Sequence, residues 1–580
     1  MGKAGTRAVR VQPDVPAIHR AFDYTLPPQL DDGTVEVGTV VRVPLHGRRV
    51  RGWVVDAHVA VPEASELRDV VAIVSAGPPA EVVELCRWAA WRWAGPVTAF
   101  LRAAQAPNRI RAGSPVDGEV AVYPGGALRG CELTVVGPRD AVVPELAPEG
   151  SSIVLDPSPT RAALLAAILR DEGREVVAFG SELSDAVRTR AWDRARAGAC
   201  VVIGGRSAVW APVPDLAAIV LFDEADEALE DERAPTWNAR DVALERARRS
   251  GAAVRIITPA PTVDALVAVD AVHVQPGRWP PLEIVDQRDE EPGHGLLSAA
   301  LADALRHTVG RDLRAVCVLN RRGRARLLAC RTCTELARCE ACGATVAQRD
   351  EGFVCARCAT TRPVVCLHCH GSTFRAVRPG ITRVRDDLAA LLPRTDVAAV
   401  DAAVIAVPDA SVLVGTEAVL HRAVDSVELV AYLEFDQELL APRARAAEQA
   451  LWLLVRGARL LADGGRVLVQ TRLPEHEVVR AARRADPRLV TDAERDRRLA
   501  LGFPPFGGVA EVSGAPEAVA AACAVAAAGG VTVLGPVDDG ARALLRAPTL
   551  AELCDALADP GIDAARTRGR LRIDVDPRRV

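Results

Sequence analysis

The stretch that decides the fold is residues 218–226, which read AIVLFDEAD. A strand buried on both faces has no polar alternation, so this apolar run predicts a strand of a parallel sheet. Similar apolar runs at 201–204 and 254–257 alternate with helix-like stretches at 161–170 and 183–198. The alternation predicts βαβ units and an α/β domain.

A second α/β unit is predicted further along the chain. It begins with the apolar run 315–319 and resumes, after a cysteine-rich interruption, with the runs 397–400 and 412–415 and a long helix near 443–461. Residues after about 505 have the pattern of a small separate α/β domain. The chain is therefore expected to be a multidomain α/β protein.

Composition limits the classes of function. The 580 residues carry a formal net charge of -5, so nucleic-acid binding would need local basic patches. The only lysine is Lys3, which leaves no internal lysine to hold a phosphate. The chain shows no apolar signal core and no run of 18 apolar residues, so we expect a cytoplasmic protein.

Eight of the 14 cysteines form four Cys-x-x-Cys pairs within forty residues. Two such pairs complete a tetrahedral zinc shell, so eight thiolates predict two closed structural zinc sites. The pairs can combine in three ways, and we favour a nested one; free thiols, a redox pair or an iron–sulfur cluster are the alternatives. The favoured inner site is Cys339, Cys342, Cys355 and Cys358, and the outer site is Cys330, Cys333, Cys366 and Cys369.

Asp223 and Glu224 follow the deciding strand, where a Walker-B pair would hold magnesium. Acidic residues also cap strands without any such role. The turn in which a phosphate-binding loop would lie argues against ATP binding, because its residues 156–160 read DPSPT between a strand and a helix. Two prolines remove backbone donors, and no glycine or lysine is present. We therefore interpret Asp223 and Glu224 as a vestigial pair and assign no catalytic or cofactor-binding residue.

Many motifs, in order along the chain, resemble the PriA family of bacterial replication restart proteins. The eight cysteines also lie where that family has its own. The other matching stretches include Arg20–Pro27 (RAFDYTLP), Val201–Ala208 (VVIGGRSA), Asn238–Ala243 (NARDVA), Gly502–Phe506 (GFPPF) and Asp574–Pro577 (DVDP).

The resemblance implies where DNA and partners bind. The N-terminal domain of the family recognises the 3′ end of the nascent strand at a fork, and Phe22 and Asp23 match residues of that pocket. An aromatic ring can stack on a terminal base and a carboxylate can accept from a 3′-hydroxyl; core packing is the alternative for Phe22. The resemblance also implies two zinc ions in the nested pairing and partners among the primosome proteins, the replicative helicase or its loader, and single-stranded DNA-binding protein.

Basic residues near one turn offer phosphate contacts. Arg48 and Arg49, with Arg42 and Arg51 close by, are candidate DNA-binding residues, although a solvated basic face would have the same pattern.

Several departures from the family predict a shortened form with a degenerate motor. The Gly-rich Lys-Thr loop is absent, the final helicase motif is reduced to residues 454–459 (LVRGAR), and 106–150 is short for a winged-helix domain. We predict six regions: a β-rich 3′ DNA-end-binding domain (1–105), a linker or reduced winged-helix region (106–150), a first helicase-like, RecA-like lobe (151–312), a second lobe (313–329 and 371–505), a two-zinc module (330–370) and a small α/β C-terminal domain (506–580).

Three functions remain open from the sequence. The favoured one is a nucleoid-associated restart protein that binds stalled forks and promotes primosome assembly without helicase activity. The alternatives are an active 3′-5′ DNA helicase with a non-standard nucleotide site, and a zinc-scaffolded protein-interaction module that no longer binds forks.

Overall fold

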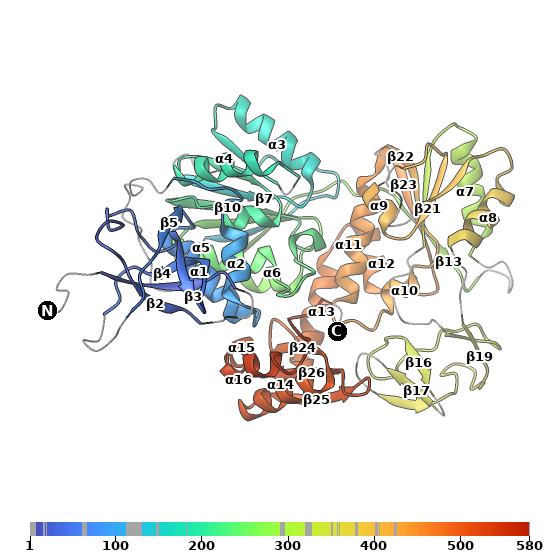
Figure 1. Cartoon of the computed structure of the whole chain (residues 1–580). Helices are drawn as coiled ribbons and strands as arrows, with labels where there is room; N and C mark the ends of the chain where they lie inside the picture. The colour runs from blue at the N-terminus through green and yellow to red at the C-terminus, as the bar shows by residue number, and fades with distance from the viewer. Residues whose placement is uncertain are drawn as a thin grey trace.

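The computed structural model describes residues 7–15, 18, 20–60, 67–111, 130–146, 150–180, 182–289, 296–319, 328–349, 352–355, 358, 360–376, 381–400, 404, 407–422 and 426–578. Figure 1 shows the N-terminal domain in blue, a first lobe in cyan and green, a second lobe in yellow and orange, and a C-terminal domain in red below and between them. The cysteine module lies beneath the second lobe.

The N-terminal domain is a five-stranded antiparallel sheet of order β2-β1-β4-β3-β5. Its core consists mainly of valines, together with Tyr24, Leu26 and Ala57, and the Tyr24 hydroxyl donates to the carbonyl of Pro44. His46 and Gly47 both have positive φ, which a two-residue hairpin between β3 and β4 requires. The strands are β1 (Ala8–Pro13), β2 (Phe22–Thr25), β3 (Val40–Leu45), β4 (Arg48–Asp56) and β5 (Ala72–Ser75).

Helices α1 (Ala80–Arg92) and α2 (Val97–Ala104) join this domain to the first lobe. The rings of Trp93, Phe100, Trp210 and Trp237 follow one another with centroids 6.2, 5.9 and 5.3 Å apart. These residues belong to one continuous core that also reaches the C-terminal domain. The N-terminal helices therefore share their hydrophobic core with the first lobe.

The first lobe is a seven-stranded parallel sheet of order β12-β6-β11-β10-β7-β9-β8. Parallel strands end at the same edge, so the loops after β7 and β10 meet. The elements are β6 (Cys131–Val135), β7 (Ser151–Leu155), β8 (Val176–Phe179), β9 (Val201–Gly204), β10 (Leu216–Phe222), β11 (Ala253–Thr258), β12 (Ala271–Val274), α3 (Pro159–Asp171), α4 (Asp185–Arg196), α5 (Ala239–Ser250), α6 (Val263–Ala268), and the 3₁₀ turns η1 (Arg206–Trp210) and η2 (Glu227–Leu229).

The second lobe is a six-stranded parallel sheet of order β13-β23-β22-β14-β21-β20. Helix α11 of this lobe faces the first lobe, as the orange ribbon in Figure 1 shows. The elements are β13 (Leu282–Asp286), β14 (Ala315–Val318), β20 (Val397–Val400), β21 (Val412–Gly415), β22 (Val427–Tyr432), β23 (Leu461–Thr471), α7 (Ala299–Val309), α8 (Ile381–Leu391), α9 (Ala418–Arg422), α10 (Asp436–Leu439), α11 (Ala446–Arg459), α12 (Glu477–Arg484) and α13 (Arg488–Leu501).

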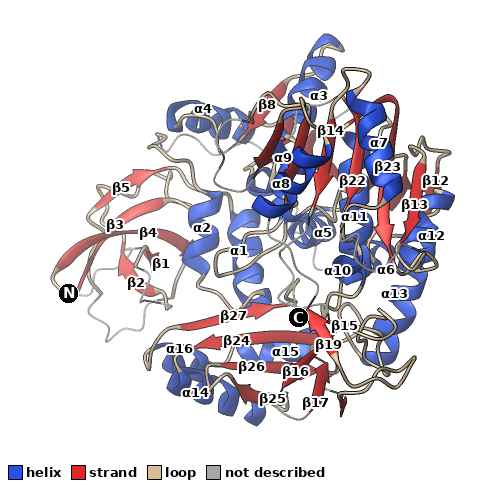
Figure 2. Cartoon of the chain, turned by 90° about the vertical axis from the view of Figure 1, so that its right-hand side faces the viewer, coloured by secondary structure: helices blue, strands red, loops and turns tan. Residues whose placement is uncertain are grey.

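The C-terminal domain is a four-stranded antiparallel sheet of order β25-β26-β24-β27 carrying three helices, and Figure 2 shows it beneath the lobes. The cysteine module contains a two-stranded and a three-stranded sheet. The elements are β24 (Gly508–Gly514), β25 (Thr532–Val537), β26 (Arg542–Ala547), β27 (Leu571–Val575), α14 (Pro516–Ala528), α15 (Leu550–Leu557) and α16 (Pro560–Arg566), with β15 (Leu328–Cys330), β16 (Val346–Arg349), β17 (Gly352–Cys355), β18 (Thr361–Pro363) and β19 (Phe374–Ala376) in the module.

The predicted fold class is confirmed, but two predicted boundaries are wrong. Strand β6 lies inside 106–150, the predicted linker, and pairs with β11 and β12 of the first lobe. Strand β13 lies inside 151–312, the predicted first lobe, and pairs with β23 of the second. Both strands are short and only partly apolar, so neither produces the continuous run that marked the inner strands. Residues 112–129 lie outside the described residues.

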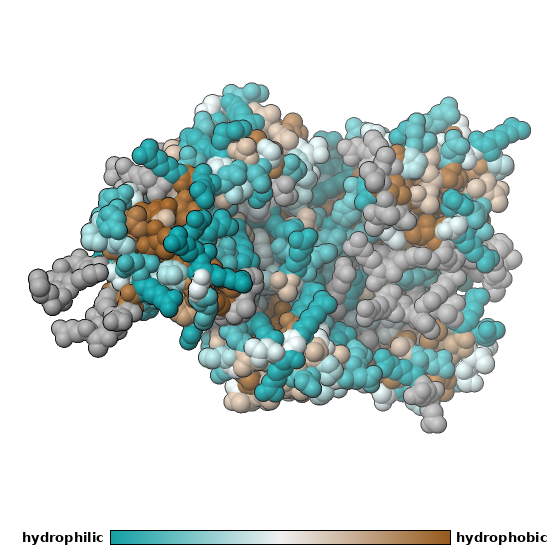
Figure 3. Space-filling model, in the orientation of Figure 1, coloured by the Kyte–Doolittle hydropathy of each residue, from teal (hydrophilic) through white to brown (hydrophobic). Residues whose placement is uncertain are grey.

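The surface is mainly hydrophilic on the face shown in Figure 3, with an apolar area over the N-terminal domain. Among the described residues, no helix combines the length and apolar character needed to cross a membrane.

The row of packed aromatic rings predicts that a substitution at Trp210 will lower the free energy of unfolding strongly. Trp210 is 1% exposed and contacts two other rings, so Trp210→Ala should leave a cavity and destabilise the protein by about 3–5 kcal/mol. Differential scanning calorimetry should show the transition of the first lobe at a lower temperature. Leu164→Ala, at a position that is 61% exposed on α3, is the matched control and should change stability by less than about 0.5 kcal/mol. Equal shifts for both variants would contradict the assigned core.

Candidate functional site

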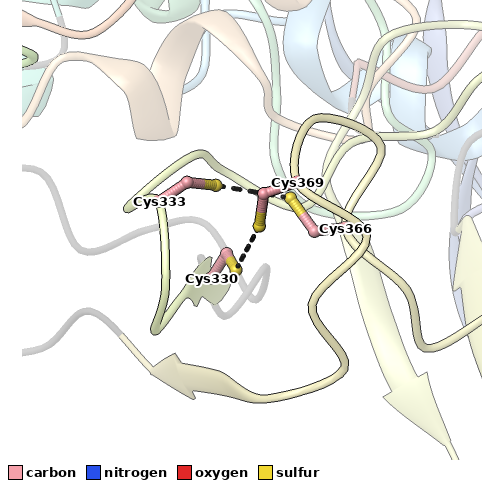
Figure 4. Close-up of side chains that lie close together, drawn as sticks. All are labelled: Cys330, Cys333, Cys366 and Cys369. Atoms are coloured by element: carbon pink, nitrogen blue, oxygen red, sulfur yellow. Dashed lines mark hydrogen bonds between the residues drawn. The ribbon is translucent and has the colours of Figure 1, made fainter.

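The eight cysteines lie in two tetrads, which are the nested sets favoured above. The outer tetrad is drawn in Figure 4, where the pair near β15 faces the pair that precedes β19. Within each tetrad every sulfur lies within 4.8 Å of the others. The outer tetrad is Cys330, Cys333, Cys366 and Cys369, and the inner tetrad is Cys339, Cys342, Cys355 and Cys358.

The sulfur spacing fits a tetrahedral metal ion. The Sγ atoms of Cys330 and Cys369, and those of Cys333 and Cys366, are 3.5 Å apart, and the inner tetrad has two contacts of the same length. A tetrahedron with Zn–S bonds of about 2.3 Å has edges of about 3.8 Å. Each tetrad could therefore hold one zinc ion in a closed, four-thiolate site.

Three of the four pairs form the same backbone turn. The N–H groups of Thr334, Gly343 and His370 each donate at 3.0 Å to the carbonyl of the first cysteine of their pair. All three residues have positive φ, so the chain reverses directly after the second cysteine. This turn lets both sulfurs of a pair point to one side, as a metal site requires.

The module has a small core and is anchored on the second lobe. Phe353 packs edge-on against Phe374 with centroids 4.8 Å apart, while the guanidinium of Arg362 lies 4.8 Å from the Phe353 ring. The N–H of Thr345 donates to the carbonyl of Leu440, next to α10. A core this small does not stabilise a fold alone, so the metal ions would supply much of its folding free energy.

The Walker-B-like carboxylate of Asp223 is fully engaged by arginines. Asp223 follows β10 with φ 51° and is buried. Arg459, the last residue of α11 in the second lobe, donates to both of its oxygens at 2.7 and 2.8 Å, and Arg161 of α3 donates at 2.5 Å. Burial alone would raise the pKa of Asp223, but the charges of Arg459 and Arg161 outweigh burial and hold the pKa below its usual range.

Glu224 points away from Asp223 toward α6. Its carboxylate accepts from the N–H of Thr262 at 2.8 Å and from the Thr262 hydroxyl at 2.9 Å, and Arg240 lies 3.5 Å away. Burial raises the pKa of Glu224 to about 7, although Arg240 and Thr262 partly offset it. Neither acidic side chain therefore presents a free carboxylate to a ligand.

The turn that should cradle phosphate is occupied by its own side chains. Asp156 accepts from the N–H of Ser158 at 2.8 Å and receives two bonds from Arg161, at 2.6 and 2.7 Å. Ser158 caps α3, which begins at Pro159. The two carboxylates are paired with arginine, and two of the five residues of the turn are prolines without an N–H group, so the arrangement differs from a magnesium and phosphate site.

A buried ion cluster joins the first lobe, the second lobe and the C-terminal domain. Arg445 donates to Asp264 at 2.7 Å and to Asp576 at 2.7 Å. Arg498 reaches Asp264 at 3.2 Å, and Arg240 lies 3.7 Å from it. Burial alone would raise the pKa of Asp264, but Arg445, Arg240 and Arg498 outweigh burial and lower it strongly.

The N-terminal candidates lie on neighbouring strands. Phe22 is half-buried on β2, and the guanidinium of Arg20 lies 4.9 Å from its ring centre. Asp23 accepts from Arg10 on β1 at 2.7 and 3.1 Å. Arg48 and Arg49 are exposed where β4 begins.

Sequence reasoning missed the partners of the acidic pair. The sequence identifies Arg459 only as part of the reduced final helicase motif, and it does not place Arg161 at the site. A basic residue directly after the proline-rich turn was the available signal for Arg161. The lobe-to-lobe contact of Arg459 had no local signal, because 236 residues separate it from Asp223.

Comparisons with known proteins find one family at both ends of the chain. Residues 10–106 match the family model of the PriA 3′DNA-binding domain, and residues 499–578 match that of the primosomal protein N C-terminal domain. The "Probable replication restart protein PriA" of Mycobacterium tuberculosis strain H37Rv is 28% identical across 97% of this chain and 99% of its own length. That of Mycobacterium leprae is 28% identical, covering 87% of each, and the replication restart protein PriA of Treponema pallidum is 30% identical over 58% of this chain and 55% of its own length.

Double substitutions distinguish the nested pairing from the other two. Cys330→Ser with Cys366→Ser removes two ligands of one tetrad, so the protein should keep about one zinc per chain. Cys330→Ser with Cys339→Ser removes one ligand from each tetrad and should leave about none. Inductively coupled plasma mass spectrometry of purified protein measures both, with Cys523→Ser, outside the tetrads, as the control that keeps two. Loss of both ions in the first variant would contradict the nested pairing.

Proposed function

We propose that the chain is a member of the PriA family of replication restart proteins, to which it is similar over most of its length. In this proposal it binds abandoned or stalled replication forks and promotes primosome assembly without helicase activity of its own. The proposal includes reloading of the replicative helicase and a place in the cytoplasm at the nucleoid.

The observation that carries the proposal is a contrast between two sites. The N-terminal domain, which matches a 3′DNA-binding domain, leaves Phe22, Asp23 and several arginines accessible. The motor site instead has both oxygens of Asp223 bound to Arg459. A chain that keeps an accessible DNA-end site beside an internally neutralised nucleotide site is suited to recognition rather than translocation.

The side chains around Phe22 could bind the 3′ end of a DNA strand. Arg20 is exposed and stacks on the Phe22 ring, so a terminal base could take that stacking position or extend it. The Asp23 side chain is 31% exposed, and each of its oxygens accepts one bond from Arg10. A carboxylate oxygen can accept a second bond, so Asp23 could also receive one from a 3′-hydroxyl.

The β3–β4 hairpin presents a basic ladder, which we define as Arg42, Arg49 and Arg51. Arg42 lies opposite Arg51, and Pro44 lies opposite Arg49, so the three arginines share the outer face of the sheet. Arg48 lies opposite Leu45 beside the turn, on the other face of the hairpin from the ladder, and is itself exposed. These charges could follow a phosphate backbone, and they give a local basic surface to a chain whose net charge is -5.

The zinc module is the proposed partner and scaffold element. Its two tetrads would hold short strands in place and present them beside the second lobe. The proposed partners are the primosome proteins, the replicative helicase or its loader, and single-stranded DNA-binding protein.

Charge reversal tests the exposed arginines at the start of β4. Arg48→Glu with Arg49→Glu should weaken binding to a fork with a 3′ end at the junction, and should flatten the dependence of log affinity on log salt by about two units if each side chain contacts one phosphate. Fluorescence anisotropy across a salt series measures both. Arg383→Glu on α8, whose side chain is 78% exposed, is the matched control. Unchanged affinity at every salt concentration would reject this surface.

ATP hydrolysis tests the loss of the motor. Zinc-loaded protein should bind forks yet release no more phosphate from ATP than Asp223→Asn does, with or without forked DNA. A coupled phosphate-release assay and fork binding are read in the same samples. Fork-stimulated hydrolysis above the Asp223→Asn variant would instead support the active helicase, and absence of fork binding would favour the zinc-scaffolded interaction module.

A further inference from the structure

We propose that Asp156 and Asp223 form an internal guanidinium site that latches the two lobes closed, so that their arrangement is independent of nucleotide. We call Asp156, Asp223, Arg161 and Arg459 the latch. The inference concerns the conformation of the lobes and does not rest on the proposed fork binding.

Charge balance is the first argument for the latch. Asp156 and Asp223 have side chains that are 0% and 2% exposed, and Arg161 and Arg459 supply two positive charges against their two negative ones. Arg161 comes from the same lobe as the carboxylates, whereas Arg459 comes from the second lobe. Withdrawing Arg459 would leave two buried carboxylates with one cation, and an uncompensated buried charge is strongly unfavourable.

Helix α11, whose last residue is Arg459, is held to the first lobe at both ends. Arg459 also donates from Nε to the carbonyl of Pro138 at 3.1 Å, and Arg456 lies 3.2 Å from Asp226. At the other end, Glu448 accepts from the N–H of Val263 at 2.8 Å. The fourteen residues of α11 span about 20 Å, so these contacts hold the lobes along the whole helix rather than at one hinge.

The C-terminal segment crosses the joint between the lobes. Arg578 donates to the carbonyl of Ala225 in the first lobe at 2.5 Å, and the Arg578 carbonyl accepts from Gln449 of α11 at 3.1 Å. Asp576 accepts from Arg445 at 2.7 Å. The C-terminal domain therefore braces the closed arrangement from outside the latch.

The consequence is a fixed spacing between the N-terminal domain and the zinc module. A ligand shifts a conformational equilibrium only when it binds one state more tightly than the other. With Arg459 bound to Asp223, magnesium-bound nucleotide has no vacant carboxylate to bind. It therefore cannot shift the equilibrium between arrangements of the two lobes. The former motor would then act as a rigid spacer.

Distance measurement between the lobes tests the latch. Fluorophores on non-canonical amino acids at Leu164 of α3 and Arg383 of α8, both exposed, report lobe separation by single-molecule energy transfer in the zinc-loaded full chain without DNA. The unmodified sequence should show one narrow population that magnesium and ATP do not change. Arg459→Ala should add a population with a longer distance. Two populations that ATP interconverts in the unmodified sequence would overturn the proposal.

Two controls keep the result specific. Arg466→Ala removes an ion pair with Glu283 inside the second lobe and should leave the distance unchanged. Low millimolar guanidinium, but not ammonium at equal ionic strength, should restore the closed population of Arg459→Ala by refilling the site. If Arg459→Ala fails to fold, Asp223→Asn tests the same contact. A folded Arg459→Ala or Asp223→Asn variant that keeps the single closed population would also overturn the latch.

Discussion

Neutralisation of buried carboxylates by arginine is the interaction on which the arrangement of this molecule depends. Asp223 and Asp264 lie at the two ends of the seam between the lobes, and each receives guanidinium groups from the second lobe. A buried ion pair is weak evidence for stability by itself, but separating its partners is costly. The pairs therefore specify how the domains meet, while the hydrophobic cores on either side supply the free energy of folding.

The two lobes and the cysteine module are stabilised in different ways. In the lobes, parallel strands are buried on both faces, and valine, isoleucine and leucine fill them. In the cysteine module, the cluster around Phe353 is too small for that, and the two tetrads would take over the role of a core when they hold metal ions. One protein thus combines large cores that need no ligand with a small module whose fold would depend on metal.

The carboxylates of Asp23 and Asp223 are both paired with arginine, but they differ in how far they are exposed. Asp23 has one partner on the adjacent strand and an exposed carboxylate, so it can still accept from outside. Asp223 has three bonds from two arginines and is buried. That difference supports the proposal that the chain recognises a DNA end through its N-terminal domain and does not use the site around Asp223 as a motor.

The sequence by itself determined the α/β class, the inner strands and the eight cysteines, because burial on both faces and two-residue cysteine spacing are local patterns. It failed at β6 and β13, which are short edge-region strands whose pairing partners lie far along the chain. Only the tertiary structure decided which cysteine pairs come together in one tetrad and which arginine neutralises Asp223. A contact across 236 residues depends on how two separately folded lobes dock, and no periodicity within either lobe encodes that docking.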